Sequence, residues 1–431
     1  MYRKIMHFLE MWKDSEYRKP LILQGARQVG KTYSILEFGR THYENVAYFN
    51  FETDPKLNET FEENISPDYL LPILSHIAGQ TIVKEKTLIV FDEVQLCERA
   101  LTSLKYFCES APEYHIIVAG SLLGVAVSRA RFSFPVGKVD MKTLYPMDME
   151  EFMLALGEDA LVGQIRESFQ NDTPMPAALH DAAMQLYRQY LVVGGMPECV
   201  MQYVETKDYI LIRHTQDTIL ASYLNDMSKY NNLNEIKKTR LAYDNITVQL
   251  SKKNTRFQYK LLKKGGRASE FENAIEWLCL SGIVSQVHRV EQIKKPLENY
   301  RDIDAFKIYV SDIGLLCAKK GLVANDVLYM VEELNDFKGG MAENYVNVQL
   351  TINGHQTYYW ESGREAEIDF VIQRDGRLIP IEVKSADNTR AKSLKVYMEA
   401  FQPDYAIKLS AKNFGFEDRK KTVPLYAAFC I

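Results

Sequence analysis

The sequence predicts an α/β protein in which a parallel sheet carries a phosphate-binding loop. Strand-like apolar runs alternate with helical runs over the first third of the chain, which predicts helices on both faces of such a sheet. The pattern G-x-x-x-x-G-K-[ST] lies between the first strand and the first helix. Short strands around an Asp-Gly turn signal predict a second, small α/β domain near the C-terminus. The length of 431 residues allows several domains, which we place at 1–155, 156–330 and 331–431.

Five short apolar runs form the predicted sheet of the first region. Each has the length of a buried strand, and helical runs or turns separate them. The first run leads through the phosphate loop into a helix expected over Tyr33–Arg40. The predicted strands are Leu21–Leu23, Val46–Phe51, Leu88–Phe91, His115–Ala119 and Val139–Leu144.

The phosphate loop predicts a nucleotide-binding site. A strand–loop–helix order points backbone N–H groups and the positive end of the helix at one place, where phosphates bind. We expect Lys31 to reach the β- and γ-phosphates of ATP and to act in catalysis, and Thr32 to offer its hydroxyl to Mg²⁺. The alternative is a glycine-bearing turn followed by a chance Lys-Thr pair. The residues expected to contact the nucleotide are Gly25, Ala26, Arg27, Gln28, Val29, Gly30, Lys31, Thr32 and Tyr33.

A second nucleotide signature ends the third predicted strand, where four apolar residues lead into Asp92 and Glu93. We expect Asp92 to hold Mg²⁺ and Glu93 to polarise the water that attacks the γ-phosphate. Ser121 follows the next strand, at the sheet edge where open α/β folds bind ligands, and is predicted to sense the γ-phosphate or that water. The alternatives are a solvated strand end for the two acids and an ordinary turn residue for Ser121.

Four segments resemble, in this order, the AAA-type ATPase domain of a large prokaryotic family: GARQVGKT, LIVFDEVQ, IIVAGSLLG and LYPMDMEEF. The resemblance implies an AAA-type P-loop NTPase fold, ATP and Mg²⁺ as cofactors, and a C-terminal domain of unknown function. It also implies a homo-oligomer, because such families often complete the site with an arginine from a neighbouring subunit. Arg129 and Arg131 are the candidates. Lys138 stands where the family usually has arginine, and lysine lacks the planar fork of arginine.

The middle region is predicted to be helical and to contain a winged helix-turn-helix. A helix is expected over Phe271–Ser281, begun by a capping box of Ser269 and Glu272. The strand-like run Ile283–Val290 follows and would form the wing. Since this recognition helix is mostly acidic, we expect the DNA backbone to be contacted by the residues before it.

The segment 237–267 is basic in a chain whose formal net charge is −5. It holds ten basic residues and one acidic residue, Asp244. This local excess favours binding to the phosphates of double-stranded DNA without reading of the bases. Two alternatives stay open, namely a solvated helix face and a contact surface for a protein. The basic residues are Lys237, Lys238, Arg240, Lys252, Lys253, Arg256, Lys260, Lys263, Lys264 and Arg267.

The last region places acidic residues and a lysine on one face of a predicted hairpin. Glu382 and Lys384 lie two residues apart in a strand, so their side chains point the same way. The Asp-Gly turn at 375–376 returns this strand against Ile368–Ile372, which brings Asp369 to the same face. Glu343 lies on a helix that we expect to begin after Gly340.

The pattern E…D…E-x-K formed by Glu343, Asp369, Glu382 and Lys384 resembles the restriction-endonuclease-like fold. Carboxylates of Glu343, Asp369 and Glu382 would hold Mg²⁺. Asp369, Glu382 and Lys384 would act in catalysis, with the lysine orienting water and stabilising charge on a phosphodiester. The alternatives are a fold retained for binding alone and cross-strand ion pairs on a wet face.

We therefore expect an Mg²⁺-dependent ATPase whose activity is linked to DNA binding or processing in the cytoplasm. Six scattered cysteines with no C-x-x-C pair fit a reducing compartment, and no apolar run is long enough to span a membrane. The alternative is an ATP-dependent switch whose C-terminal domain binds protein or nucleic acid without cutting. A protein-remodelling ATPase is a third and weaker interpretation.

Overall fold

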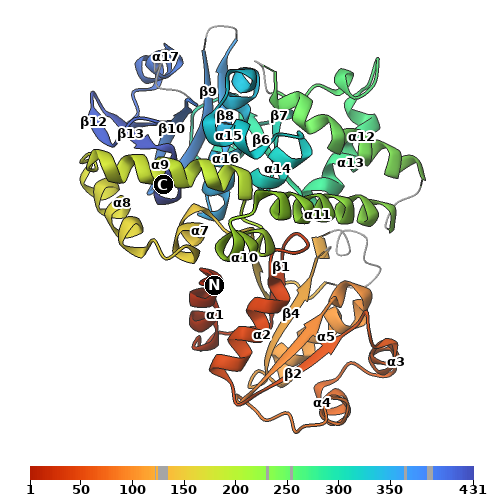
Figure 1. The fold of residues 1–431 in the computed structure, drawn as a ribbon. Coiled ribbons are helices and arrows are strands. Elements are labelled where there is room, and N and C mark those ends of the chain that lie inside the picture. The colour runs from red at the N-terminus through yellow and green to blue at the C-terminus, as the bar shows by residue number, and fades with distance from the viewer. Residues whose placement is uncertain (122, 125–133, 230–232, 253–255, 364–365, 386–391) are drawn as a thin grey trace. The chain divides into compact units, whose positions relative to one another are not determined.

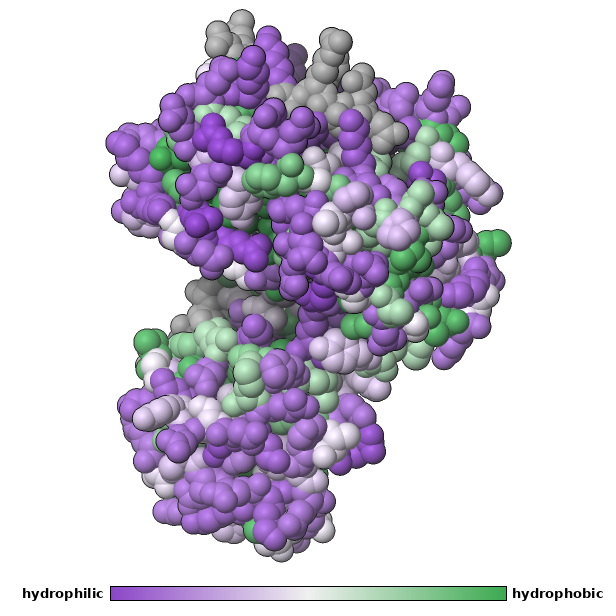
Figure 2. All heavy atoms as spheres, turned by 90° about the vertical axis from the view of Figure 1, so that its left-hand side faces the viewer, coloured by the Kyte–Doolittle hydropathy of each residue, from purple (hydrophilic) through white to green (hydrophobic). Residues whose placement is uncertain are grey.

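The computed structural model describes two compact units. One is built mainly from Tyr2–Tyr145 and the other mainly from Pro146–Cys279 and Ile283–Ile431. Hydrophilic side chains cover most of the surface drawn in Figure 2, and hydrophobic side chains lie in patches between them. In the described part of the chain, no helix is both long and apolar enough to cross a membrane. The described residues are 1–121, 123–124, 134–229, 233–252, 256–363, 366–385 and 392–431.

The N-terminal unit is a parallel sheet with the strand order β2-β3-β4-β1-β5 in its described residues (Figure 1). All five predicted strands are confirmed to within one residue at either end. The elements are α1 (Ile5–Lys13), β1 (Leu21–Gln24), α2 (Lys31–His42), β2 (Asn45–Asn50), α3 (Pro55–Glu63), α4 (Pro67–Ile77), β3 (Thr87–Asp92), η1 (Val94–Leu96), α5 (Glu98–Ser110), β4 (His115–Gly120) and β5 (Asp140–Thr143).

A cluster of phenylalanines anchors β3 in this sheet. Phe91 is fully buried, and its ring packs edge-to-face against Phe49, Phe51 and Phe61 with centroids 5.5 to 5.9 Å apart. Burial of each such ring contributes about 1.5–3 kcal/mol to stability. Because Asp92 follows Phe91 directly, this cluster fixes the end of the strand that carries the acidic pair.

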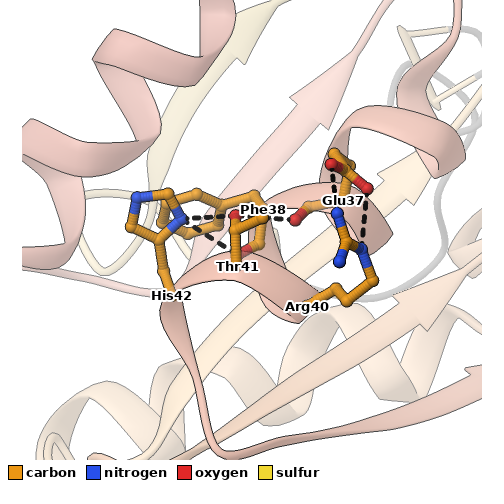
Figure 3. Close-up of polar contacts among 5 residues, drawn as sticks. All are labelled: Glu37, Phe38, Arg40, Thr41 and His42. Atoms are coloured by element: carbon orange, nitrogen blue, oxygen red, sulfur yellow. Dashed lines mark hydrogen bonds and ion pairs between the residues drawn. The ribbon is translucent and has the colours of Figure 1, made fainter.

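Helix α2 is stabilised at the end opposite the phosphate loop. Arg40 donates two hydrogen bonds to Glu37, at 3.0 and 2.7 Å, and the His42 ring stacks on Phe38 with centroids 4.7 Å apart (Figure 3). Two basic residues in the last turn also complement the negative end of the helix dipole.

The second unit joins helices to a mixed sheet with the strand order β12-β13-β11-β10-β9-β8-β6-β7 in its described residues. Its elements are α7 (Met149–Ala155), α8 (Asp159–Asn171), α9 (Ala177–Val193), α10 (Pro197–Thr206), α11 (Tyr209–Lys229), α12 (Leu233–Leu250), η2 (Tyr259–Leu261), α13 (Ala268–Leu280), β6 (Val284–Val290), η3 (Leu297–Tyr300), β7 (Arg301–Val310), α14 (Ile313–Lys319), α15 (Ala324–Tyr329), η4 (Glu332–Leu334), α16 (Asn335–Ile352), β8 (Tyr358–Ser362), β9 (Ala366–Arg374), β10 (Arg377–Val383), α17 (Lys392–Phe401), β11 (Ala406–Ser410), β12 (Gly415–Glu417), β13 (Lys420–Pro424) and η5 (Leu425–Cys430).

Strands from the middle and last regions belong to one sheet. The predicted strand Ile283–Val290 is present as β6, which pairs antiparallel with β7 and parallel with β8. The predicted hairpin is present as β9 and β10, with Asp375 and Gly376 at positive φ in the turn. Strand β7 was not predicted. The pairing of β6 with β8 makes the middle region part of the C-terminal sheet.

Two predicted helix starts are wrong. Helix α16 begins at Asn335, so Gly340 lies inside it and does not precede it. A Cβ atom on Gly340 would lie 2.2 Å from the carbonyl oxygen of Leu250, and close packing against α12 therefore explains this glycine. Helix α13 begins at Ala268, which places Ser269 in the first turn and not at the cap.

A buried carboxylate holds the corner after α9. Asp312 accepts hydrogen bonds from the backbone N–H groups of Gly195, at 2.6 Å, and Leu315, at 2.8 Å. Burial raises the pKa of Asp312 to about 6, although these N–H donors act in the opposite direction. A Cβ atom on Gly195 would lie 1.9 Å from the Met147 carbonyl oxygen, so this corner requires glycine.

Candidate functional site

The phosphate loop connects β1 to α2 through backbone conformations that favour glycine. Gly25 and Gly30 have φ angles of +147° and +89°, and Gln28 between them also has a positive φ. A Cβ atom on Gly25 would lie 2.1 Å from the carbonyl oxygen of Leu144. The loop can therefore pass close to β5 and present the N-terminus of α2 to an anion.

Lys31 is folded back onto its own loop. Its Nζ donates hydrogen bonds to the carbonyl oxygens of Gly25, at 2.9 Å, and Ala26, at 2.8 Å. Burial lowers the pKa of Lys31 to about 8, while Glu93 and Asp92 partly oppose this shift. A phosphate group would give the ammonium a stronger acceptor than these two carbonyl groups.

Thr32 and Asp92 are brought together as predicted for an Mg²⁺ site. The Thr32 hydroxyl donates to Oδ2 of Asp92 at 2.8 Å, and Asp92 is 4% exposed. The Tyr48 hydroxyl donates to the same oxygen, also at 2.8 Å. The backbone N–H of Glu93 donates to Oδ1 at 2.9 Å, so the carboxylate is oriented from three sides.

Glu93 and Ser121 lie at the carboxyl ends of β3 and β4. The side-chain amide of Gln95 donates a hydrogen bond to Oε2 of Glu93. A Cβ atom on Gly120 would lie 2.4 Å from Oε1 of Gln95, so the Gln95 side chain packs on the end of β4. Among the described residues, neither Oε1 of Gln95 nor Oγ of Ser121 has a hydrogen-bond partner, although both are buried.

The donor set of this site fits ATP with Mg²⁺. Thr32 and Asp92 supply the oxygen ligands that Mg²⁺ prefers, and Lys31 supplies a cation. The buried Ser121 hydroxyl has no partner within the part of the chain that the structure describes. A bound Mg²⁺ would neutralise phosphate charge. Of the remaining residues predicted to contact nucleotide, Tyr33 is 60% exposed at the start of α2, while Ala26 and Val29 are buried in the loop.

The predicted arginines of a neighbouring subunit, Arg129 and Arg131, lie outside the described residues. Lys138, at the position where arginine was expected, forms an ion pair of 3.0 Å with Glu109. The positive charge of Lys138 is therefore partly compensated by a carboxylate of the same unit.

The four residues of the E…D…E-x-K pattern lie in one charged cluster formed by α16, β9 and β10. Nζ of Lys384 is 2.7 Å from Oε1 of Glu382, and the backbone N–H of Val383 donates to Asp369 at 2.7 Å. Burial raises the pKa of Asp369 to about 8, and the nearby Glu343 adds to the rise. These contacts are consistent with the prediction from the sequence that the four residues lie close together.

Lys307 of β7 also belongs to this cluster. Its side chain is 1% exposed, and Nζ lies 2.5 Å from Glu367 and 3.4 Å from Glu343. Burial alone would lower the pKa of Lys307, but Glu343 and the other neighbouring acids raise it well above the ordinary value. The Tyr309 hydroxyl donates to Glu343 at 2.9 Å. A buried ammonium is thus paired with Glu343, which was predicted to bind a metal, and with Glu367, which was not.

The acids of this cluster are arranged for ion pairs with lysines, which weighs against a divalent metal there. In the described ranges, no group of three or more His, Cys, Asp and Glu side chains could hold a metal ion. Lys307 compensates the charge of Glu343, and the raised pKa of Asp369 favours its protonated form at neutral pH. The buried Oε2 of Glu382 has no hydrogen-bond partner among the residues that the structure describes. We therefore assign no reaction step to a metal at this cluster.

The basic segment 237–267 runs from α12 to the start of α13. Lys260, Lys264 and Arg267 are exposed, whereas Lys263 forms an ion pair of 2.8 Å with Glu270. A hollow of about 1170 Å³ lies beside the segment and is lined in part by Lys237, Lys238 and Lys263. Lys253 lies outside the described residues.

Three residues near the candidate sites were not predicted, namely Tyr48, Gln95 and Lys307. A lysine within the otherwise apolar run 305–310 was an available signal for Lys307. Tyr48 and Gln95 carry no comparable local signal, because their roles depend on the pairing of β2 with β3 and on the packing of η1 against β4.

Three protein-family models match the chain. An AAA domain matches residues 17–153, a domain of unknown function (DUF8612) matches 184–326, and a second domain of unknown function (DUF4143) matches 338–428. A comparison with curated protein sequences found no match. An AAA domain implies a nucleoside triphosphatase that binds ATP.

Several solved structures are similar to parts of the chain. A Walker-type ATPase of Pyrococcus abyssi has 14% identity and a TM-score of 0.44, covering 73% of this chain and 94% of that one. The ORC2 protein of Aeropyrum pernix has 13% identity and a TM-score of 0.33, covering 79% and 93%. RuvB of Thermotoga maritima has 12% identity and a TM-score of 0.28, covering 67% and 88%. The family matches therefore show that the chain contains an AAA-type P-loop domain followed by two domains of unknown function.

Proposed function

We propose that the chain hydrolyses ATP with Mg²⁺. The observation that carries this proposal is the hydrogen bond of 2.8 Å between Thr32 and Asp92, which joins the two nucleotide signatures at one point. Lys31 would bind the β- and γ-phosphates. Glu93, the next residue after Asp92, would accept a proton from the attacking water.

The test is ATP hydrolysis by the full chain with Mg²⁺, compared with Glu93→Gln and Lys31→Ala. We expect Glu93→Gln to keep ATP binding and to lose roughly 10²- to 10⁴-fold in kcat, since it removes only the proton acceptor. Lys31→Ala should lose binding itself. Equal hydrolysis by wild type and Glu93→Gln would contradict the proposal.

We propose that the middle region binds double-stranded DNA and that ATP hydrolysis is linked to this binding. The helices α12 and α13, followed by the antiparallel pair β6–β7, support a winged helix-turn-helix in which β6 also pairs with β8 of the larger sheet. Exposed basic residues lie before α13, which itself carries Glu270, Glu272 and Glu276. This distribution suits phosphate contacts better than contacts to bases.

The corresponding test is binding of a DNA duplex at several salt concentrations. Changing Lys260, Lys264 and Arg267 together to alanine should weaken binding to all sequences and reduce its salt dependence. A matched control changes three other exposed cations of the same unit, Lys395, Lys412 and Arg419. Equal losses in both triple variants would indicate general charge attraction, and no loss in the first would exclude this surface.

For the C-terminal domain we propose binding without cleavage. The supporting observation is the buried Lys307 beside Glu343 and Glu367, which supplies a cation from the protein. The assignment of Asp369, Glu382 and Lys384 as catalytic residues stays a prediction. Nicking of supercoiled DNA with Mg²⁺ or Mn²⁺ that is lost in Asp369→Asn would restore it.

Self-association is also proposed, because the resemblance to AAA-type families implies sites shared between subunits. Its test is the mass of the full chain in solution with and without ATP. A monomer under both conditions, with full ATPase activity, would exclude a shared site.

A further inference from the structure

Gln95 has a position that the nucleotide motifs do not explain. It lies in the short helix η1, two residues after Glu93, and its amide nitrogen donates to Oε2 of that carboxylate. A carboxylate accepts hydrogen bonds only, so the donor is the amide nitrogen, and Oε1 is the other end of the group.

The carbonyl end of Gln95 is buried against the end of β4. Among the described residues Oε1 has no hydrogen-bond partner, and the same is true of Oγ of Ser121. A buried acceptor without a donor is unfavourable, so each oxygen is suited to a further hydrogen bond. Both oxygens can bond to water, and Ser121 lies at the sheet edge where ligands bind in this class of fold.

Gly120 makes room for this side chain. A Cβ atom at position 120 would lie 2.4 Å from Oε1 of Gln95, while the next nearest atom, Cδ1 of Leu123, would be 3.4 Å away. Any other residue at 120 therefore has to displace the end of the Gln95 side chain. The left-handed backbone of Glu93, with φ of +52°, turns the chain so that η1 approaches β4.

We propose that Gln95 is a positioning residue for ATP hydrolysis: its amide orients the Glu93 carboxylate, and its carbonyl oxygen accepts a hydrogen bond from the attacking water. The oxygen of this water bonds to the γ-phosphorus, the bond from that phosphorus to the ADP oxygen breaks, and one proton of the water passes to Glu93. Before the step, Glu93 and Gln95 accept hydrogen bonds from the two O–H groups of the water and so fix the direction of its lone pair. This inference rests on the proposed ATPase activity.

The test is steady-state ATP hydrolysis by the full chain in two single variants. Gln95→Met removes both polar atoms at similar volume, and Gly120→Ala keeps Gln95 but displaces it. We expect each to lower kcat roughly 10- to 100-fold with little change in KM for ATP, since misplacement of a reacting group acts on the transition state. The double variant should be no slower than the worse single one.

A structural glutamine provides the control. Nε2 of Gln80 donates to the Val46 carbonyl oxygen at 2.7 Å, in the same unit. Gln80→Met should lower the melting temperature and leave kcat unchanged, whereas the two site variants should lower kcat. Because Gly120→Ala only has to move a flexible side-chain end, it remains informative even if Gln95→Met fails to fold.

Unchanged kcat in Gly120→Ala and Gln95→Met would overturn the inference. It would also be overturned if the fold-decrease in kcat of the double variant equalled the product of the two single decreases. If wild type hydrolyses ATP and only Glu93→Gln does not, the ATPase proposal stands and the role of Gln95 is excluded. If wild type itself does not hydrolyse ATP, the proposed function fails first.

Discussion

The hydroxyl of Thr32 donates a hydrogen bond of 2.8 Å to the carboxylate of Asp92, across sixty residues of sequence. Thr32 lies in the first turn of α2 and Asp92 ends β3, so the contact depends on the packing of α2 against the parallel sheet. It places the two groups predicted to hold Mg²⁺ at one location.

Tyr48 is expected to tune the Mg²⁺ requirement of ATP hydrolysis. Its hydroxyl shares Oδ2 of Asp92 with Thr32, so Tyr48→Phe leaves the carboxylate less firmly oriented. Loss of one hydrogen bond of about 1 kcal/mol corresponds to an about fivefold higher Mg²⁺ concentration for half-maximal activity. Tyr43→Phe is the matched control, because its hydroxyl bonds His115 at 2.7 Å and not the site. An identical Mg²⁺ dependence in Tyr48→Phe and wild type would exclude the role.

The lowered pKa of Lys31, about 8, predicts a pH dependence of ATP binding. Phosphates attract the ammonium form, so ATP binding raises this pKa and takes up a proton when the free protein is partly deprotonated. Affinity should therefore fall as pH rises above 8, by up to about tenfold per pH unit. Calorimetry in two buffers of different ionisation enthalpy measures the uptake at pH 8. No proton uptake on ATP binding, or uptake equal to that of Lys31→Arg, would contradict the assignment of the proton uptake to Lys31.

Gly340 and Gly339 form a matched pair for a stability test. A Cβ atom on Gly340 would meet the Leu250 carbonyl oxygen at 2.2 Å, while one on Gly339 would meet nothing within 4 Å. Gly340→Ala should lower the free energy of unfolding by about 1–3 kcal/mol through overpacking. Gly339→Ala should raise it by up to about 1 kcal/mol, because alanine is the better helix former. Denaturant unfolding of both variants measures the difference. Equal effects on the free energy of unfolding would show that α12 shifts to accommodate the added methyl group, and would contradict this expectation.

Lys307 is expected to keep divalent metal out of the C-terminal cluster. In the absence of nucleotide, wild type should show no Mn²⁺ binding that depends on Asp369. Lys307→Met removes the buried cation beside Glu343 and Glu367, so this variant should bind Mn²⁺ and gain melting temperature from it. Adding Asp369→Asn should abolish the gain. Mn²⁺ binding by wild type that is lost in Asp369→Asn would contradict the expectation without any need for the Lys307 variant.

The nucleotide site was largely predictable because its residues lie in short, continuous segments of the sequence. Gly25 to Thr32 form one loop, and Asp92 and Glu93 are adjacent, so spacing alone identifies them. Their convergence follows from the rule that parallel strands present their carboxyl ends at one edge. The five strands were found for the same local reason.

The contacts made by Lys307 and Gly340 depend on partners far away in the sequence. Lys307 pairs with acids 36 and 60 residues later, and Gly340 packs against a residue 90 positions earlier. Gly340 was expected to precede a helix, and Lys307 was assigned no role. In both cases a tertiary contact decides what the residue does.

The pairing of β6 with β8 has a practical consequence for dividing the chain. A fragment that begins at 338, where the second domain of unknown function is matched, would start inside α16 and would lack β6 and β7. Strand β8 would then become an open edge, which invites pairing with another chain, and Glu343 would lose Lys307. The two C-terminal families are therefore best expressed, and exchanged between relatives, as one piece.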